Sequence, residues 1–448
     1  MVHAFLLHGT AMLLDVYSGA VHVVDQMVVD IVQLFEQCTK QEILSQLQEK
    51  YTSDALEEGY EEVAILKQQG LLFAQDSYEA IATQFDQPTV VKALCLHIAH
   101  DCNLRCKYCF AETGSFHGSR SMMQLDVGKA AIDFVIEKSG NRKNIEIDFF
   151  GGEPLMNFEV VKQIVHYAKQ QGEQAGKHFR FTITTNGMLL NADNSAFINE
   201  HMVNVVLSLD GDKQVNDAMR PRIDGSGTYD RIVPMFRQLA KERAHQGYFV
   251  RGTFTSQNLE FAKDVLHLAD LGFEQISVEP VVAPDDKHYA LKEAHLPILF
   301  LEYEKLAQAF VERSQAGQGF HFFHFALDLS GGPCAQKRLK GCGSGYEYLA
   351  VTPEGDLYPC HQFVGNTQLK MGDVFEKTID ASISKSFRER NVYTQTTCKD
   401  CWAKFYCSGG CPANAHQLNG DMDKPYEVGC ALMKKRIECA LWIKAMLG

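Results

Sequence analysis

Between residues 93 and 282, short apolar runs alternate with longer segments whose apolar residues recur every three or four positions. The short runs predict strands, and the wider spacing predicts helices with one buried face. We expect strands at 93–99, 144–150, 179–185, 203–209, 248–255 and 275–282, and helices at 124–138, 155–172, 229–245 and 259–271. Repeated strand–helix units build a parallel sheet, and six units make a partial (β/α)6 TIM-like barrel, open on one side. Catalytic groups of such barrels lie at the C-terminal ends of the strands.

The first 85 residues predict a smaller unit with a different pattern. Three short strands at 2–7, 11–16 and 20–24 precede helical patterns at 25–35, 40–51 and from Ser53 or Asp54 to Gln69. Three strands and three helices at this size suggest a winged-helix fold. Residues 76–88 are polar and predict a linker.

The last third of the chain changes again after a helix expected at 292–314. Residues 330–430 are rich in Gly, Cys and short turns, so they bury little apolar surface unless metal centres hold them together. Residues 430–447 predict a closing amphipathic helix. We therefore divide the chain into units at 1–85, 90–315, 330–430 and 431–448.

The composition fits a folded protein with several domains. The 448 residues are 46% apolar and 22% charged, which excludes a wholly disordered or collagen-like chain. Lys and Arg total 43 against 56 Asp and Glu, a net charge of −13 that argues against broad nucleic-acid binding. We see neither a membrane-length apolar run nor a basic signal-peptide region, and expect a cytoplasmic protein. In a reducing cytosol, fourteen cysteines at ligand-like spacings favour metal binding over disulfides.

The first cysteine group is Cys102-x3-Cys106-x2-Cys109, directly after the first barrel strand. Three thiolates on one tight loop can hold three irons of a [4Fe–4S] cluster and leave the fourth iron open for chemistry. Zinc is the alternative ligand, but this spacing lacks the paired knuckles of common zinc sites.

The second barrel strand ends in Gly151-Gly152-Glu153-Pro154, and paired glycines let a backbone approach a ligand closely. Together with the cysteine loop, this motif resembles the radical S-adenosylmethionine (SAM) superfamily over residues 93–284. The resemblance implies that SAM binds the open iron and that Gly151, Gly152 and Glu153 receive its amino group. It also implies further SAM contacts from strand ends and loops: Tyr108 near the adenine, Asn186, Ser208, and Arg220 at the carboxylate.

Seven cysteines in the last third form a second pattern, which resembles the SPASM extension of radical SAM enzymes that modify peptides. The resemblance covers residues 334–430 and implies two auxiliary [4Fe–4S] clusters, three in all. One would be held by Cys398, Cys401, Cys407 and Cys430, and the other by Cys342, Cys360 and Cys411. Either Cys334 is an eighth ligand or one iron stays open, and we favour the open iron. A zinc ribbon explains Cys398-x2-Cys401 alone but not all seven.

The N-terminal unit can bind either DNA or a peptide that adds a strand to its sheet. Its many acidic residues, such as Glu57, Glu58, Glu61 and Glu62, disfavour phosphate contacts, so we favour a peptide. The unit resembles the recognition elements of enzymes that process ribosomally synthesised peptides. From end to end, the chain resembles the maturases of SCIFF peptides, which carry six cysteines in about forty-five residues.

This resemblance implies an enzyme that joins peptide cysteine sulfur to carbon as thioether cross-links, through a 5′-deoxyadenosyl radical. It also implies a cysteine-rich precursor bound through its leader, and a low-potential electron donor of the flavodoxin or ferredoxin type. The alternatives are a sulfatase-type maturase that makes formylglycine and, outside the enzymes, a zinc-bearing DNA-binding regulator. The carboxylates Asp210, Glu279 and Asp356 are candidate bases, and the sequence singles out none of them.

Overall fold

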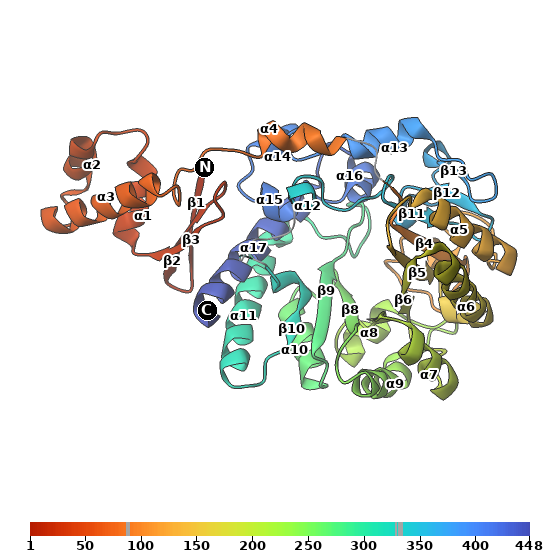
Figure 1. Ribbon diagram of the computed structural model, residues 1–448. Helices are drawn as coiled ribbons and strands as arrows, with labels where there is room; N and C mark the ends of the chain where they lie inside the picture. Colours follow the sequence, from red (N-terminus) through yellow and green to blue (C-terminus); the bar gives the residue numbers. More distant parts are fainter. Residues whose placement is uncertain (87–89, 328, 330–334) are drawn as a thin grey trace.

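A computed structural model describes residues 1–86, 90–327, 329 and 335–448. Its centre is a ten-stranded sheet with the order β10-β9-β8-β7-β6-β5-β4-β11-β12-β13, shown in Figure 1. The six expected strands are confirmed as parallel neighbours: β4 (Ala93–Ala99), β5 (Asn144–Gly151), β6 (His178–Thr185), β7 (Asn204–Ser208), β8 (Tyr248–Phe254) and β9 (Gln275–Pro280). The sequence order of these strands is their order in the sheet, so each crossover connects adjacent strands.

The last third of the chain extends this sheet at both edges. β10 (His321–Phe322) pairs with β9 in parallel, and β11 (Tyr348–Val351) pairs with β4 in parallel. β12 (Asp356–Tyr358) and β13 (Gly372–Asp373) continue antiparallel beyond β11. The cysteine-rich region is therefore attached to the first barrel strand by a shared sheet.

Helices cover the outer face of the barrel strands: α5 (Leu125–Lys138), α6 (Phe158–Ala175), α9 (Tyr229–Glu242), α10 (Phe261–Asp270) and α11 (Leu296–Gln315). Along β5, Ile145, Ile147 and Phe149 are buried in the main core, while the intervening residues turn to the barrel interior. Two further helices, α7 (Ala192–His201) and α8 (Lys213–Met219), were not expected. Their N-termini are capped by the side chains of Asn191 and Asp212, and capping defines them better than their weak apolar periodicity.

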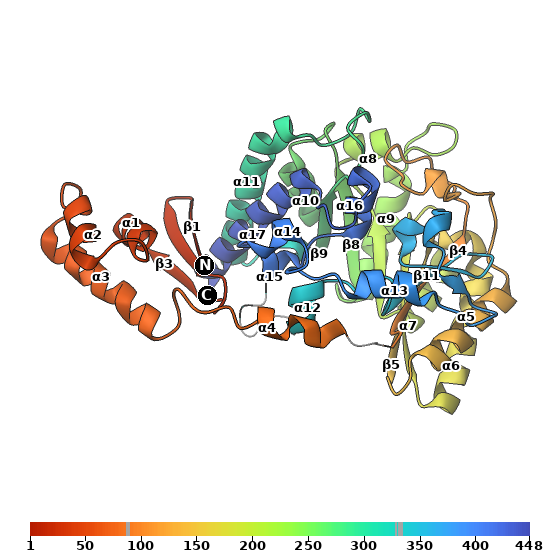
Figure 2. The ribbon, with the colours of Figure 1, turned by 90° about the horizontal axis from the view of Figure 1, so that it is seen from above.

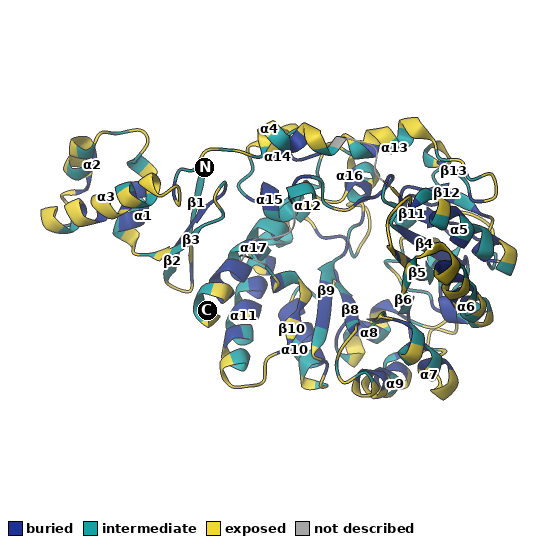
Figure 3. Ribbon diagram, viewed as in Figure 1, coloured by how far each residue is buried: buried dark blue, intermediate teal, exposed yellow. Residues whose placement is uncertain are grey.

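The N-terminal unit has the expected winged-helix-like composition of three strands and three helices: β1 (Val2–Leu7), β2 (Thr10–Asp15), β3 (Val21–Val24), α1 (Gln26–Leu34), α2 (Lys40–Leu47) and α3 (Ser53–Gln68). Its sheet is buried on both faces. Ala11 and Leu13 pack with the unit's own helices, whereas Met12 and Leu14 belong to the main core cluster. Figure 3 shows exposed residues concentrated on the outer helices α2 and α3, away from this junction.

The segment expected to be a polar linker contains a short helix, α4 (Glu79–Ala82), which lies against the cysteine-rich region in Figure 2. The Tyr393 hydroxyl donates to both oxygens of Asp76, at 2.7 and 2.8 Å. Lys399 forms an ion pair with Glu79 at 2.9 Å. Residues 87–89 lie outside the described residues. The described part of the connection is therefore docked on the protein.

The chain closes with α17 (Glu427–Leu447), which begins three residues before the expected start and packs along α11. Between β13 and α17, short helices alternate with loops: α13 (Ala381–Arg388), α14 (Thr396–Lys399), α15 (Lys404–Cys407) and α16 (Pro412–Asn419). In the part of the chain that the structure describes, no helix has the length and apolar character needed to span a membrane.

Candidate functional site

A cavity of about 150 Å³ lies at the C-terminal ends of β4 to β7. Cys102, Cys106 and Cys109 line it from the loop after β4. The other predicted SAM-site residues on its wall are Tyr108, Gly151, Gly152, Asn186, Ser208 and Arg220. Residues separated by up to 118 positions thus meet in one place, as expected for the strand ends of a barrel.

The glycine pair after β5 allows two chain segments to cross at this cavity. Gly151 has φ +118°, and a Cβ built on it would lie 2.4 Å from the carbonyl oxygen of Ala99. A Cβ on Gly152 would lie 2.1 Å from the carbonyl oxygen of Asp101. Any larger residue would push away the segment that carries Cys102.

Glu153 is fully buried behind this wall. Its carboxylate accepts hydrogen bonds from the backbone N–H groups of Leu155 at 3.0 Å and Asn186 at 2.8 Å, and from the Thr185 hydroxyl at 2.8 Å. Burial raises its pKa to about 6, although these donors favour the ionised form. Glu153 therefore ties the ends of β5 and β6 together, and its expected contact with the SAM amino group stays a prediction.

Partly buried Tyr108 forms a triad with the buried Asp210 and Arg220 beside the cysteines. The Tyr108 hydroxyl donates to Asp210 at 2.6 Å and accepts from Nη1 of Arg220 at 2.8 Å. Arg220 also lies 3.8 Å from the Asp210 carboxylate. The sequence suggested Asp210 only as a candidate base. Its location just after β7 was the one sequence feature that pointed to this site. The triad connects the cysteine loop to the strand end by charge-assisted hydrogen bonds.

The Arg220 side chain provides a test of whether this cavity fits SAM. Its Nε is buried and lacks a hydrogen-bond partner among the described residues. An unsatisfied buried N–H on a cation favours an anionic ligand, because leaving it unpaired costs free energy. A SAM carboxylate is such a ligand, so the cavity fits the group that the sequence implies.

Asn186 connects the third strand end to the cysteine loop. Its side-chain amide donates to Asn103 at 2.8 Å and approaches the Sγ of Cys102 at 3.6 Å. Burial raises the pKa of the Cys102 thiol to about 12 and that of Cys106 to about 11. Buried thiols of this kind ionise when a metal supplies the compensating charge, which is consistent with an iron–sulfur site.

The second cysteine site is a cavity of about 600 Å³ beside α17, lined by Cys398, Cys401, Cys407 and Cys430. Burial raises the pKa of Cys407 to about 11 and of Cys430 to about 12. The structure thus brings together the four residues that the SPASM resemblance groups, from α14, the following loop, α15 and α17.

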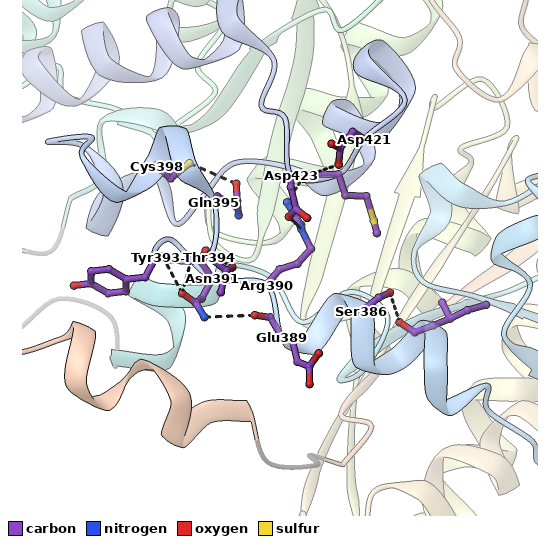
Figure 4. A network of polar contacts seen from close by, with 12 residues as sticks. Ser386, Glu389, Arg390, Asn391, Tyr393, Thr394, Gln395, Cys398, Asp421 and Asp423 are labelled. Carbon is purple, nitrogen blue, oxygen red and sulfur yellow. Dashed lines mark hydrogen bonds and ion pairs between the residues drawn. The ribbon is translucent and has the colours of Figure 1, made fainter.

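A network of polar contacts shapes the segment that leads to this cavity (Figure 4). The Cys398 thiol contacts Oε1 of Gln395 at 3.5 Å, and Gln395 is buried. The Asn391 side chain accepts from the backbone N–H groups of Tyr393 and Thr394 at 2.9 and 3.2 Å. Arg390 donates to Asp423 at 2.8 Å, which joins this segment to the approach to α17. These contacts hold the first and last cysteines of the site on neighbouring segments.

The third group contains Cys342, Cys360 and Cys411, which lie close enough to affect one another's ionisation. Burial, with a contribution from the neighbouring Cys411 and Cys342, raises the pKa of Cys360 to about 12. Cys334 lies outside the described residues, so the question of an eighth ligand stays open. Among described residues, no group of three or more His, Cys, Asp or Glu side chains is arranged to hold a single metal ion.

Comparison with known proteins connects these sites to two domain families. A profile of the 4Fe-4S single cluster domain matches residues 91–231, and a profile of SPASM, an iron-sulfur cluster-binding domain, matches residues 342–402. The first match contains Cys102, Cys106 and Cys109, and the second contains Cys342, Cys360, Cys398 and Cys401.

Similar curated proteins include the cysteine-type anaerobic sulfatase-maturating enzyme of Clostridium novyi, 24% identical, with 70% of this chain and 86% of the relative covered. The radical SAM cyclopropyl synthase TigE of Paramaledivibacter caminithermalis is 22% identical, and the match covers 77% of this chain and 72% of TigE.

Two solved structures share the fold. Native anSMEcpe with bound AdoMet has a TM-score of 0.64 at 18% identity and covers 78% of this chain and 96% of its own. Streptococcus suis SuiB bound to precursor peptide SuiA has a TM-score of 0.55 at 16% identity, and the match covers 93% of this chain and 96% of SuiB. The matched profiles, the barrel and the cysteine sites show a radical SAM fold with a SPASM domain, with three [4Fe–4S] clusters and SAM as cofactors.

Proposed function

We propose that this chain is a peptide-modifying radical SAM enzyme that installs thioether cross-links in a cysteine-rich precursor peptide. The observation that carries the proposal is the N-terminal sheet: among the described residues no strand pairs with the outer edge of β3, while the inner face of the sheet packs on the catalytic body. An exposed edge is suited to pairing with an extended leader peptide. The structure of SuiB bound to its precursor peptide matches 93% of this chain, so the similarity in fold includes the N-terminal unit.

We assign Cys102, Cys106 and Cys109 to the SAM-binding cluster. Cys398, Cys401, Cys407 and Cys430 would hold one auxiliary cluster, and Cys342, Cys360 and Cys411 the other. When bound, SAM and its cluster supply the radical that removes hydrogen from an unactivated carbon. The protein's own part is orientation: Arg220 offers its free Nε–H to the SAM carboxylate, and Gly151 and Gly152 let the backbone approach the amino group.

The chemical balance of a cross-link defines the test. One carbon loses a hydrogen, one cysteine loses its thiol proton, a carbon–sulfur bond forms, and one surplus electron leaves for an acceptor. Mass spectrometry of the precursor after reaction should show a loss of about 2 Da per cross-link, from the two hydrogens removed. Each cross-link should also remove one thiol from alkylation by iodoacetamide. Unchanged peptide mass in the presence of SAM cleavage would contradict the proposal.

A formylglycine-forming maturase is the second candidate, because sulfatase-maturating enzymes are among the similar curated proteins. Formylglycine carries an aldehyde, which a hydrazide probe labels, and a thioether carries none. A hydrazide-reactive product would therefore select this candidate. A product with one fewer thiol and no aldehyde would select the thioether.

A further inference from the structure

The barrel interior contains an ion pair that the SAM cavity does not use. Arg251 on β8 donates from Nε to Glu279 on β9 at 3.1 Å, and its Nη2 lies 2.9 Å from the second carboxylate oxygen. Both strands have a neighbour on each side in the sheet, yet the two side chains are 48% and 35% exposed. They alternate with Val250 and Val278, which are buried in the main core, so the pair faces the open interior.

A second guanidinium approaches this pair from α17. Nη1 of Arg436 donates to Nδ1 of His324 at 2.8 Å, and the His324 Nε2 lies 3.3 Å from the Ser277 hydroxyl on β9. Burial lowers the pKa of His324 to about 3, and the Arg436 charge lowers it as well, so the imidazole is neutral. Among described residues, no carboxylate lies within 4 Å of the Arg436 guanidinium.

The charges of this cluster do not balance. Burial would raise the Glu279 pKa, but the charge and hydrogen bond of Arg251, together with the Arg436 charge, outweigh it and hold the pKa at about 2. The cluster therefore contains one carboxylate and two guanidiniums, with a neutral histidine between Arg436 and β9. Within the part of the chain that the structure describes, one guanidinium of this cluster therefore has no carboxylate partner, which favours an anionic guest beside it.

Residues of this cluster neighbour both cysteine-lined cavities. Arg251 pairs in the sheet with Ser208, which lines the SAM cavity. On the other side, the Arg436 charge acts on the thiol of Cys407, which lines the cavity beside α17. α17 packs against the short helix η5 (Phe323–Phe325), which contains His324 and which also contacts β9. A peptide segment that reaches the SAM cavity through the barrel interior would pass these side chains.

We infer that Arg251, Glu279 and Arg436 form a subsite in the barrel interior that receives an anionic side chain of the peptide substrate, a cysteine thiolate or a carboxylate. The inference rests on the proposed function as a peptide-modifying enzyme. Nη1 of Arg251 and Nε of Arg436 lack protein partners among the described residues, so each guanidinium retains a donor for the guest. Charge-assisted hydrogen bonds from guanidinium groups suit both thiolate and carboxylate.

The test measures how much the peptide core adds to leader binding. Fluorescently labelled leader and full cysteine-rich precursor are titrated anaerobically with the cluster-loaded enzyme, and the ratio of their Kd values gives the core contribution. The enzyme variants are Arg436→Gln, the charge-retaining Arg436→Lys, and Lys444→Gln as a control for charge removal on the exposed side of α17. Leader affinity and the melting temperature report folding in each variant.

Two precursor variants identify the anion, one with core Cys→Ser and one with core Asp and Glu changed to their amides. We expect Arg436→Gln to reduce the core contribution about tenfold or more, because it removes the unpaired charge. Arg436→Lys should restore part of it, and Lys444→Gln should leave it unchanged. One of the two peptide variants should lose the same contribution in wild-type enzyme, with no further loss in Arg436→Gln.

The inference is overturned if Arg436→Gln keeps the core contribution, or if it weakens binding equally for the unsubstituted precursor and both peptide variants. Failure of the proposed function looks different: wild-type enzyme would bind precursor and leader equally and leave the precursor mass unchanged.

Discussion

Tyr108 belongs to the first cysteine motif and also holds the buried charges of Asp210 and Arg220 together. It lies between two cysteines of the first group, and its hydroxyl joins the Asp210 carboxylate to the Arg220 guanidinium. Asp210 is fully buried and would otherwise meet Arg220 only at 3.8 Å. Burial of a charge is tolerated when hydrogen bonds and an opposite charge compensate it.

Tyr108→Phe should therefore destabilise the fold by about 1–3 kcal/mol, the cost of leaving a buried polar group unsatisfied. It should also weaken SAM binding, because Arg220 loses the contact that orients it. Anaerobic denaturant unfolding and calorimetric titration with SAM measure the two effects. Tyr167→Phe is the matched control, since that hydroxyl donates to a carboxylate on the outer helices, Asp133, at 2.8 Å. Equal effects of the two substitutions would contradict the role given to the triad.

Gly151 gives a second prediction at this scale. Gly151→Ala should displace the segment that carries Cys102, because its Cβ would lie 2.4 Å from the Ala99 carbonyl oxygen. Gly176→Ala is the control: it has φ +66° and open space around its Cβ, so it should cost only about 1–2 kcal/mol of backbone strain. Iron content and thermal melting measure both variants. Full iron content in Gly151→Ala would show that the glycine is dispensable.

At the scale of elements, the N-terminal sheet has one feature suited to recognition, the free edge of β3. The backbone N–H of Asp15 donates to Ala20 across the β2–β3 turn, so the alternation of an antiparallel pair directs the His22 and Val24 backbone groups toward β2. The Val21 and Val23 groups then point outward from the sheet. Val23, Ile65 and Leu71 are also large exposed apolar residues of this unit.

Val23→Pro should remove an outward donor and leave the β2–β3 pairing in place, since proline lacks the N–H group. Leader affinity, measured by anisotropy, should fall about tenfold, while SAM cleavage without peptide continues. Val23→Thr is the control, because it keeps the backbone donor and the β-branched shape. Unchanged leader affinity in the proline variant would place the leader elsewhere.

At the scale of the whole molecule, we expect each of the three cysteine sites to bind its own iron–sulfur cluster. The chain should hold about twelve irons and as many sulfides, since each [4Fe–4S] cluster needs its own thiolates. Replacing Cys102, Cys106 and Cys109 by Ala should remove about four irons and all SAM cleavage. Cys411→Ser should remove an auxiliary cluster but leave the first one intact. Stoichiometric zinc without sulfide would overturn the assignment.

The N-terminal unit is joined to the rest of the molecule more tightly than a tethered domain. His3 stacks on Trp402 with ring centroids 3.7 Å apart and contacts Glu438 at 3.0 Å. Both partners line the cavity of the four cysteines. Leu7, Met12 and Leu14 are also buried in the main core cluster.

Deletion of residues 1–85 should therefore lower the melting temperature as well as abolish leader binding, because it exposes the apolar surface beneath the sheet. His3→Ala should lower the melting temperature less and keep leader binding, which separates the docking contact from the recognition edge. Differential scanning calorimetry and leader titration on the same samples measure both. A deletion variant as stable as the full chain would show that the unit is detachable.

The sequence by itself determined the barrel strands, the cysteine groups and the glycine motif. These features are local, because strand periodicity, ligand spacing and turn residues each depend on residues close together in the sequence. The sequence patterns missed α7 and α8, because these helices have weak apolar periodicity and are defined by their N-terminal caps. The docking of α4 depends on partners such as Tyr393 and Lys399, more than 300 residues away.

Only the tertiary structure decided which distant charges meet. Asp210 and Glu279 were equivalent candidates in the sequence, yet one lies in the Tyr108 triad and the other between Arg251 and the approach of Arg436. Likewise, no pattern in β2 shows that Met12 faces the catalytic body while Leu13 faces the unit's own helices. Period-two alternation assigns residues to opposite faces of a strand, but what covers each face depends on how the chain packs as a whole.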